Sequence, residues 1–232
     1  MIPLRDNNPS RRLPVVTWLL IAANAALFLY ELTLGVNLES FLMSAAFIPA
    51  RAHEAGVGGL AWEAKSALLS MFLHAGWMHF LGNMLFLWIF GDNVEDRLGP
   101  IRYLVFYLLC GYAAALGHTL SAPTSPLPAI GASGAIAGVL GAYLYLYPRA
   151  RIVTLIFFGF FSRVVELPAM VYLLIWFGMQ FLSGLASLSG AGAQQGGVAW
   201  FAHIGGFVAG PVLLLLLGGR RAPRNSLPPV DF

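Results

Sequence analysis

AIGASGAIAGVLGA, residues 129–142, combines small residues with a single hydroxyl inside an apolar segment. Gly134, Gly138 and Gly141 recur at nearly helical spacing, and small residues so spaced let neighbouring helix backbones approach closely in membranes. Ser133 stands near the start of this predicted helix, where other helices would surround it. Serine is also an ordinary packing residue in such contacts, so this stretch alone leaves the role of Ser133 open.

The composition is that of a polytopic membrane protein. Apolar residues make up 59% of the 232 positions and charged residues 10%, against about 45–50% and about 25% in soluble domains. The single cysteine, Cys110, excludes an intramolecular disulfide. The net charge of +3 comes mainly from arginines near the ends of apolar segments, and no basic stripe is interleaved with aromatics, which argues against a nucleic-acid partner.

Six segments approach the roughly 20 apolar residues that a helix needs to cross a bilayer. They are residues 14–34, 68–90, 101–120, 131–147, 168–187 and 199–217. The first is too long for a signal-peptide core and has no clear cleavage site, so it is expected to be retained. The sequence therefore predicts an all-α bundle at 14–218, an N-terminal cytoplasmic segment at 1–13 and a cytoplasmic tail at 219–232.

The basic residues predict the orientation, because they accumulate on the cytoplasmic side of membrane proteins. With six spans, the side that holds both termini also holds Arg5, Arg11, Arg12, Arg97, Arg102, Arg149, Arg151, Arg163, Arg220, Arg221 and Arg224. The other side holds only Arg51 and Lys65. Both termini are therefore expected in the cytoplasm.

Three segments between the predicted spans have compositions that predict where they lie. Residues 35–67 mix aromatics with glycine and charge and are predicted to form a partly helical loop at the membrane interface. Residues 152–161 are apolar but too short to span, and are predicted to lie at the cytoplasmic interface. Residues 188–198 are uncharged and glycine-rich and are predicted to form a mobile cap over the outer face.

Polar residues inside spans are costly, so each is a candidate for function. Ser133 and His203 lie at similar depths, about 5 Å and about 7 Å from the outer ends of their segments at about 1.5 Å per residue. His79 and Asn83 share one helix face at i and i+4, but a helix starting at Leu68 would carry them deeper, to about 16–22 Å.

Ser133 and His203 are the types of residue that nucleophilic catalysis requires, because a serine hydroxyl attacks only when a base takes its proton. Asn83, His79 and the Ser133 backbone N–H are candidate donors to an oxyanion. The nearest acid, Glu31, lies at the outer end of the first span, so a dyad is predicted rather than a triad. The alternative is that His203 has only a structural role and donates a hydrogen bond to a neighbouring backbone carbonyl.

Other chemistries fit the sequence less well. The run H-A-G-W-M-H at 74–79 is not the H-E-x-x-H of zinc proteases, so no metal is expected. The sequence around Ser133 does not match the G-x-S-x-G turn of soluble hydrolases, because Ala135 stands where the second glycine is required. No cofactor is predicted. Paired intramembrane charges and repeated broken helices, typical of transporters, are not visible in the sequence.

Three motifs together resemble the rhomboid family of intramembrane serine proteases. They are GASG at 131–134, HAGWMHFLGN at 74–83 and AHIGGFVAG at 202–210, each in the expected span. The resemblance implies a six-transmembrane-helix rhomboid bundle with an interfacial first loop. It departs from the family at Lys65-Ser66, where many relatives carry Trp-Arg, and at Ala137, where some carry an aromatic that packs on the base.

The resemblance also implies roles for particular residues. Ser133 would be the nucleophile and His203 its base, in a cavity open to the outer side, with His79 and Asn83 at the serine's level. The small residues implied to pack helices around the site are Gly131, Gly134, Gly206 and Gly210. The residues implied to lie beside the substrate's entry route are Trp176, Phe177 and Met179.

The predicted function is an intramembrane serine endopeptidase that cleaves single-pass membrane proteins in or near their transmembrane segments. Segments with Gly, Pro or small residues near the outer interface should be preferred, because their helices unravel at low cost. The alternative is a non-catalytic rhomboid-like protein that binds membrane clients. The short polar ends of the sequence favour a prokaryotic plasma membrane as its location, with the active site facing outward.

Overall fold

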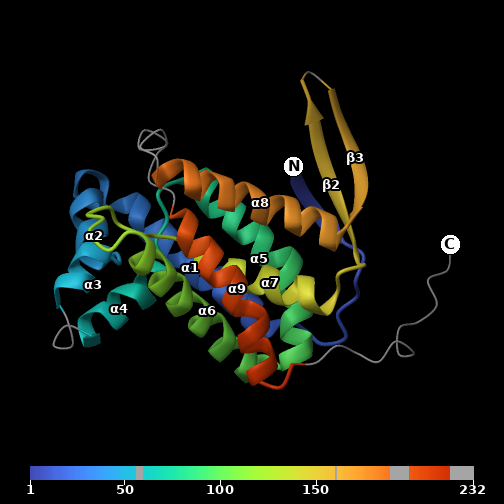
Figure 1. Cartoon of the computed structure of the whole chain (residues 1–232), viewed down its shortest axis with the longest axis horizontal. Coiled ribbons are helices and arrows are strands. Elements are labelled where there is room, and N and C mark those ends of the chain that lie inside the picture. The colour runs from blue at the N-terminus through green and yellow to red at the C-terminus, as the bar shows by residue number, and fades with distance from the viewer. Residues whose placement is uncertain (56–59, 160, 189–198, 220–232) are drawn as a thin grey trace.

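The computed structural model describes residues 1–55, 60–159, 161–188 and 199–219 (Figure 1). These parts of the chain are mostly helical. The main bundle comprises α1 (Val15–Thr33), α5 (Trp77–Leu98), α6 (Pro100–Ser121), α7 (Ser133–Leu146), α8 (Ala169–Leu188) and α9 (Trp200–Leu216). Helices α1, α6 and α8 are long and apolar enough to cross a membrane, and α7 and α9 are shorter apolar helices.

Helix α7 forms the centre of the bundle, and most of its side chains are buried. Helix α9 packs along both α6 and α7 (Figure 1). Cys110 of α6 and Leu140 and Tyr143 of α7 belong to the fully buried core. The small residues that the sequence places on α7 therefore lie where three helices meet.

Helix α5 begins at Trp77, so the prediction that the second apolar segment is helical from residue 68 is wrong. A separate helix, α4 (Leu60–Ser70), ends first, and the chain then turns. The buried Glu31 carboxylate of α1 accepts the backbone N–H of His74 within this turn, at 3.2 Å to each oxygen. The later start places His79 in the first turn of α5, which corrects the depth calculated from residue 68.

The opposite end of α5 caps α1. The Glu95 carboxylate, 3% exposed, accepts the backbone N–H of Val16 at 2.9 Å and that of Thr17 at 2.8 Å. The Thr17 hydroxyl donates to the same carboxylate at 2.8 Å. Helix α1 has no acid in its own first turn, so Glu95 supplies both the acceptors and the negative charge that a helix N-terminus favours.

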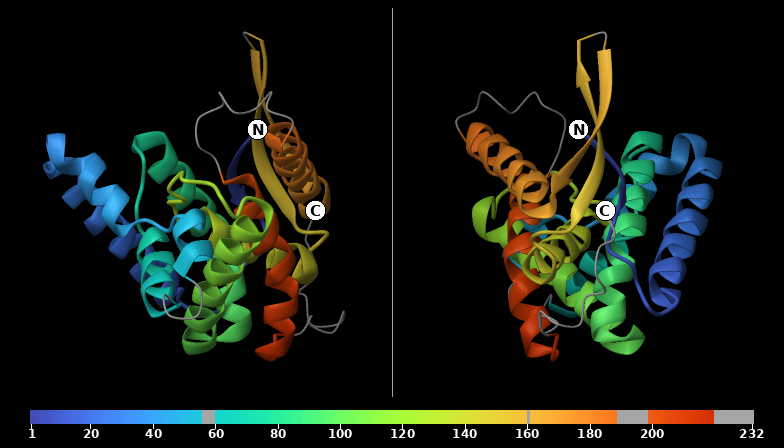
Figure 2. Two further views of the ribbon diagram at one scale, coloured as in Figure 1. Left: turned by 60° about the vertical axis from the view of Figure 1, so that its left-hand side comes forward. Right: turned by 90° about the vertical axis from the view of Figure 1, so that its right-hand side faces the viewer.

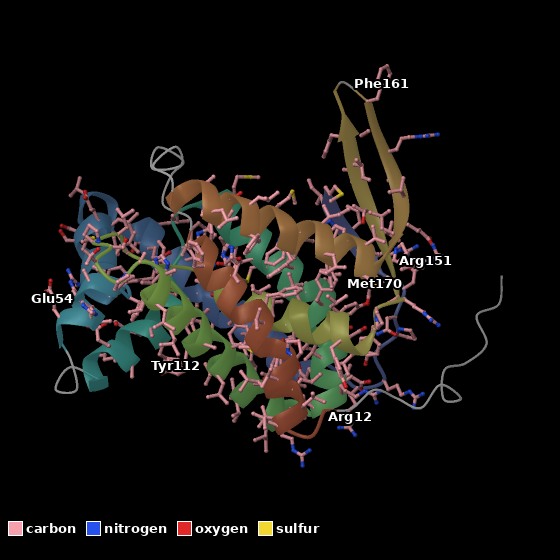
Figure 3. All side chains as sticks on the ribbon, in the orientation of Figure 1. Arg12, Glu54, Tyr112, Arg151, Phe161 and Met170 are labelled. Carbon is pink, nitrogen blue, oxygen red and sulfur yellow. The ribbon has the colours of Figure 1, made fainter. Side chains whose placement is uncertain are left out.

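The connection between α1 and α5 is largely helical where it is described. It contains η1 (Gly35–Asn37), α2 (Leu38–Ala45), α3 (Pro49–Ala55) and α4. Tyr112 of α6 donates its hydroxyl to the Ala64 carbonyl at 3.1 Å, which ties α4 to the bundle (Figure 3 labels Tyr112). The position of this connection at a membrane interface stays a prediction.

A three-stranded antiparallel sheet corrects the all-α expectation. It consists of β1 (Ile2–Asp6), β2 (Arg151–Phe158) and β3 (Phe161–Pro168), in the order β1-β2-β3. Its β2-β3 hairpin projects beyond the helices in both views of Figure 2. Phe161, 78% exposed, lies at the tip and Arg151 at the base (Figure 3). The apolar run predicted at 152–161 therefore lies in strand β2 as far as Phe158, and its last residue, Phe161, begins β3.

Strand β1 is fastened to α7 by a side-chain hydrogen bond. The Tyr143 hydroxyl donates to Asp6 Oδ2 at 2.5 Å. Burial raises the pKa of Asp6 to about 6, although the bond from Tyr143 opposes this shift. The folded protein thus holds the Asp6 proton more tightly than the unfolded chain does.

This shift predicts a pH-dependent stability. The contribution of Asp6 is fully present below its ordinary pKa near 4 and is lost as the pH rises through about 6. In thermal unfolding in detergent between pH 5 and pH 7.5, the melting temperature of wild type should fall more steeply, or rise less steeply, with pH than that of Asp6→Asn, whose side chain does not titrate. Equal slopes for the two proteins would contradict this assignment.

Candidate active site

Ser133 and His203 meet across two helices. Ser133 is the first residue of α7, and His203 lies in the first turn of α9. Ser133 Oγ and His203 Nε2 are 2.7 Å apart and hydrogen-bonded. Seventy positions of sequence separate the two residues, so their contact depends on how closely α7 and α9 pack.

Glycines on the facing surfaces allow that close packing. A Cβ at Gly206 would lie far inside van der Waals contact of the Gly134 carbonyl oxygen. A Cβ at Gly210 would meet the Gly138 carbonyl oxygen in the same way. On the other side of α7, a Cβ at Gly134 would lie 2.6 Å from Ala114 Cβ of α6. Gly206 follows His203 by three residues and thus fixes the height of the imidazole beside α7.

The loop before α7 brings His79 and Asn83 to the same place. Gly131 has φ +118°, a backbone conformation that L side chains rarely adopt. A Cβ there would lie 2.6 Å from His79 Nε2 and 3.5 Å from Asn83 Nδ2. The two side chains of α5 therefore flank the backbone two residues before Ser133.

Both α5 side chains can present donors at this point. The Ala75 N–H donates to His79 Nδ1 at 3.4 Å, which leaves the hydrogen of the neutral ring on Nε2. Asn83 is 8% exposed, and its Nδ2 has no hydrogen-bond partner among the described residues. The N-terminus of α7 adds backbone N–H groups and the positive end of its dipole. Together these groups suit a developing negative charge on oxygen.

Two backbone hydrogen bonds hold the loop that carries Gly131. The Gly131 N–H donates to the Ser70 carbonyl at 2.8 Å. The Ala129 N–H donates to the Phe47 carbonyl, also at 2.8 Å. The connection between α1 and α5 thus fixes the approach of the chain to Ser133.

Gln180 of α8 is a site residue that the sequence reasoning missed. Its Oε1 lies 2.7 Å from His203 Nδ1, and the side chain is 9% exposed. Trp176, one helical turn earlier, lies with its ring centroid 6.0 Å from that of His203. An amide inside the apolar segment 168–187 was the available signal, because buried polar groups in a span are costly unless paired.

The three residues expected beside the substrate's entry route differ in their contacts and exposure. Trp176 packs against His203, and Phe177 stacks on Phe207 of α9 with centroids 4.7 Å apart. Met179 is 48% exposed on the outside of α8. Residues 189–198, most of the predicted cap, lie outside the described residues, as does the tail from residue 220.

Known proteins resemble this chain over much of its length. The "Rhomboid protease GluP" of Bacillus subtilis is 31% identical over 206 residues, which cover 88% of this chain and 35% of that protein. The "Rhomboid protein 1, mitochondrial" of Saccharomyces cerevisiae is 30% identical over 150 residues, 62% of this chain and 39% of that protein.

A plant protein gives a similar match. "Rhomboid-like protein 11, chloroplastic" of Arabidopsis thaliana is 30% identical over 151 residues, 63% of this chain and 50% of that protein. The chain thus spans between about a third and a half of the length of these relatives. A family model described as "Rhomboid domain" matches residues 61–220, which include Ser133, His203, His79, Asn83 and Gln180. The chain therefore belongs to the rhomboid family.

Proposed function

We propose that this protein is an intramembrane serine endopeptidase that uses Ser133 and His203. The observation that carries the proposal is the 2.7 Å hydrogen bond between Ser133 Oγ and His203 Nε2. A packing serine has no need of a histidine at this position. Membership of the rhomboid family, with a relative named as a protease, supports the same reading.

The chemistry is acyl transfer in two stages. His203 Nε2 takes the Ser133 hydroxyl proton as Oγ attacks the scissile carbonyl carbon. The resulting oxyanion accepts hydrogen bonds from His79 Nε2–H, Asn83 Nδ2–H and the Ser133 backbone N–H. His203 then protonates the leaving amine, and water hydrolyses the acyl-enzyme with His203 again as the base. The protein groups in these steps all belong to this chain, and the scheme needs no metal or cofactor.

The membrane arrangement belongs to the same proposal. Helices α1, α5, α6, α7, α8 and α9 would cross the bilayer as one catalytic domain, residues 14–218, with the connection between α1 and α5 at the outer interface. Residues 1–13 and 219–232 would lie in the cytoplasm, as the distribution of arginines favours. Ser133, at the outer end of α7, would then face the outer side of a prokaryotic plasma membrane.

The proposed substrates are single-pass membrane proteins, consistent with the family's action on membrane proteins within the bilayer. A peptide bond inside a helix is shielded by its own hydrogen bonds, so the substrate segment must unwind before attack. Glycine and proline near the outer end of the segment lower that cost by about 1 and about 3 kcal/mol relative to alanine.

Cleavage in liposomes tests the proposal. Purified protein is reconstituted with a panel of single-pass proteins, half of which carry a Gly-Pro pair near the outer end of the segment, and fragments are sized by mass spectrometry. The proposal expects fragments cut in or near the Gly-Pro segments with wild type and none with Ser133→Ala. A folded wild type that binds these proteins without cutting any would favour the non-catalytic client-binding function.

A further inference from the structure

We infer that Gln180 is the positioning residue of the catalytic base, a third residue that orients His203 within the Ser133–His203 pair. This inference rests on the proposed function. Three helices contribute one member each: α7 carries the serine, α9 the histidine and α8 the glutamine. The two hydrogen bonds in series are both 2.7 Å long.

The bond to Gln180 selects the protonation pattern that catalysis requires. An amide oxygen only accepts hydrogen bonds, so His203 Nδ1 must carry the hydrogen when it bonds to Gln180 Oε1. In the neutral ring, Nε2 then has its lone pair free to accept the Ser133 hydroxyl hydrogen. The opposite tautomer would direct an N–H at Ser133 and could not act as a base.

Gln180 also compensates the charge that His203 gains. When the Ser133 proton moves to Nε2, both ring nitrogens carry hydrogens, and the Oε1 dipole faces the new positive charge at Nδ1. This amide occupies the position that a carboxylate holds in a Ser-His-Asp triad. The proton returns from Nε2 to the leaving amine, so the ring is neutral again when the acyl-enzyme has formed.

Helix α8 restrains the ring in a second way. Trp176 precedes Gln180 by four residues and so shares its helix face. The Trp176 ring is tilted 36° to the His203 imidazole. The Trp200 ring meets the same imidazole edge-on, with centroids 6.3 Å apart. These contacts fix the plane of His203, while Gln180 fixes which nitrogen points at Ser133.

The test measures kcat, KM and the pH–rate profile of liposome cleavage for Gln180→Met and Gln180→Glu beside wild type. Methionine matches the length of glutamine but lacks the amide, so kcat should fall about 10- to 100-fold while KM stays within about twofold. Glutamate restores the acceptor, so kcat should recover above the level of the methionine variant. Leu182→Met, at a position 67% exposed on the same helix, is the matched control and should keep wild-type rates.

The pH profile tests whether the side chain at position 180 contacts the His203 ring. His203 faces Ser133 from α7 and Gln180 from α8, and it interacts electrostatically with His79 of α5 and His118 of α6. A carboxylate at 180 would favour the protonated ring, so the acid limb of the kcat profile should move to higher pH by about one unit. An unmoved limb would show that the side chain at position 180 does not reach the His203 ring.

Two results would overturn the inference while the proposed function stands. One is a folded Gln180→Met protein with the kcat of wild type. The other is a Gln180→Glu protein that is no faster than Gln180→Met and has an unmoved acid limb. A wild-type protein that fails to cleave any substrate would instead remove the proposed function, and this inference with it.

Discussion

Replacing Ser133 by alanine is expected to lower the rate of peptide-bond cleavage by at least about 1,000-fold, the scale of loss when a catalytic nucleophile is removed. His203→Ala should lower the cleavage rate by a similar factor, because the nucleophile and the base act only together. The Ser133–His203 hydrogen bond is the physical reason. Single-turnover cleavage in liposomes, with fragments quantified over time, measures both variants.

The double variant makes this prediction sharper. If the two residues act as one unit, Ser133→Ala combined with His203→Ala should be no slower than either single variant. Ser183→Ala on α8, another serine in an apolar helix, is the control and should cleave at the wild-type rate. Losses that simply multiply in the double variant would show that the residues act independently.

Adding one methyl group at Gly206 or Gly210 is expected to have the second-largest effect. A Cβ at either position would overlap a carbonyl oxygen of α7, and backbone cannot move aside as a flexible side chain can. Gly206→Ala and Gly210→Ala should each destabilise the fold by about 1–3 kcal/mol. They should also reduce cleavage at least about tenfold, because a separation of α9 from α7 lengthens the Ser133–His203 contact.

A glycine with free space around it provides the comparison. A Cβ at Gly178 of α8 would have no neighbouring atom within 4 Å. Gly178→Ala should therefore keep its activity and match or exceed the wild-type melting temperature, since alanine favours helix by about 1 kcal/mol over glycine. Thermal melting curves of the three glycine-to-alanine variants measure this difference in stability. Equal curves for Gly206→Ala and Gly178→Ala would show that the α7–α9 contact is looser than described.

Much of the helical fold could be predicted, because apolar length and proline positions are local signals. Pro100 opens α6, next to the start of the predicted segment 101–120. The start of α5 could not be read in this way, because residues 68–76 are mostly apolar. The chain turns where the His74 N–H donates to Glu31, a contact between residues far apart in sequence. Strand β1 was missed because its partner lies far away in sequence, with Ile2 of β1 paired to Leu155 of β2. The β2-β3 hairpin is local, but its apolar first strand has a sequence that also fits an interfacial segment.

The candidate site was predictable to a different degree for each residue. Ser133 and His203 could be proposed as a pair, because only a few polar residues lie inside apolar segments and these two have complementary chemistry. Gln180 was overlooked because an amide in a span has many uses, and only the packing of α8 on α9 brings it to Nδ1. The hydrogen bond between Tyr143 and Asp6 could not be predicted either, because the two residues lie far apart in sequence.

The most direct measurement is the mass spectrum of the purified, folded protein after reaction with a fluorophosphonate, which bonds covalently to an activated serine hydroxyl. One adduct is expected, mapped by peptide fragmentation to Ser133, and it should be lost in Ser133→Ala and in His203→Ala. A folded wild-type protein that gains no adduct, or an adduct that persists in Ser133→Ala, would contradict the assignment of Ser133 as the nucleophile.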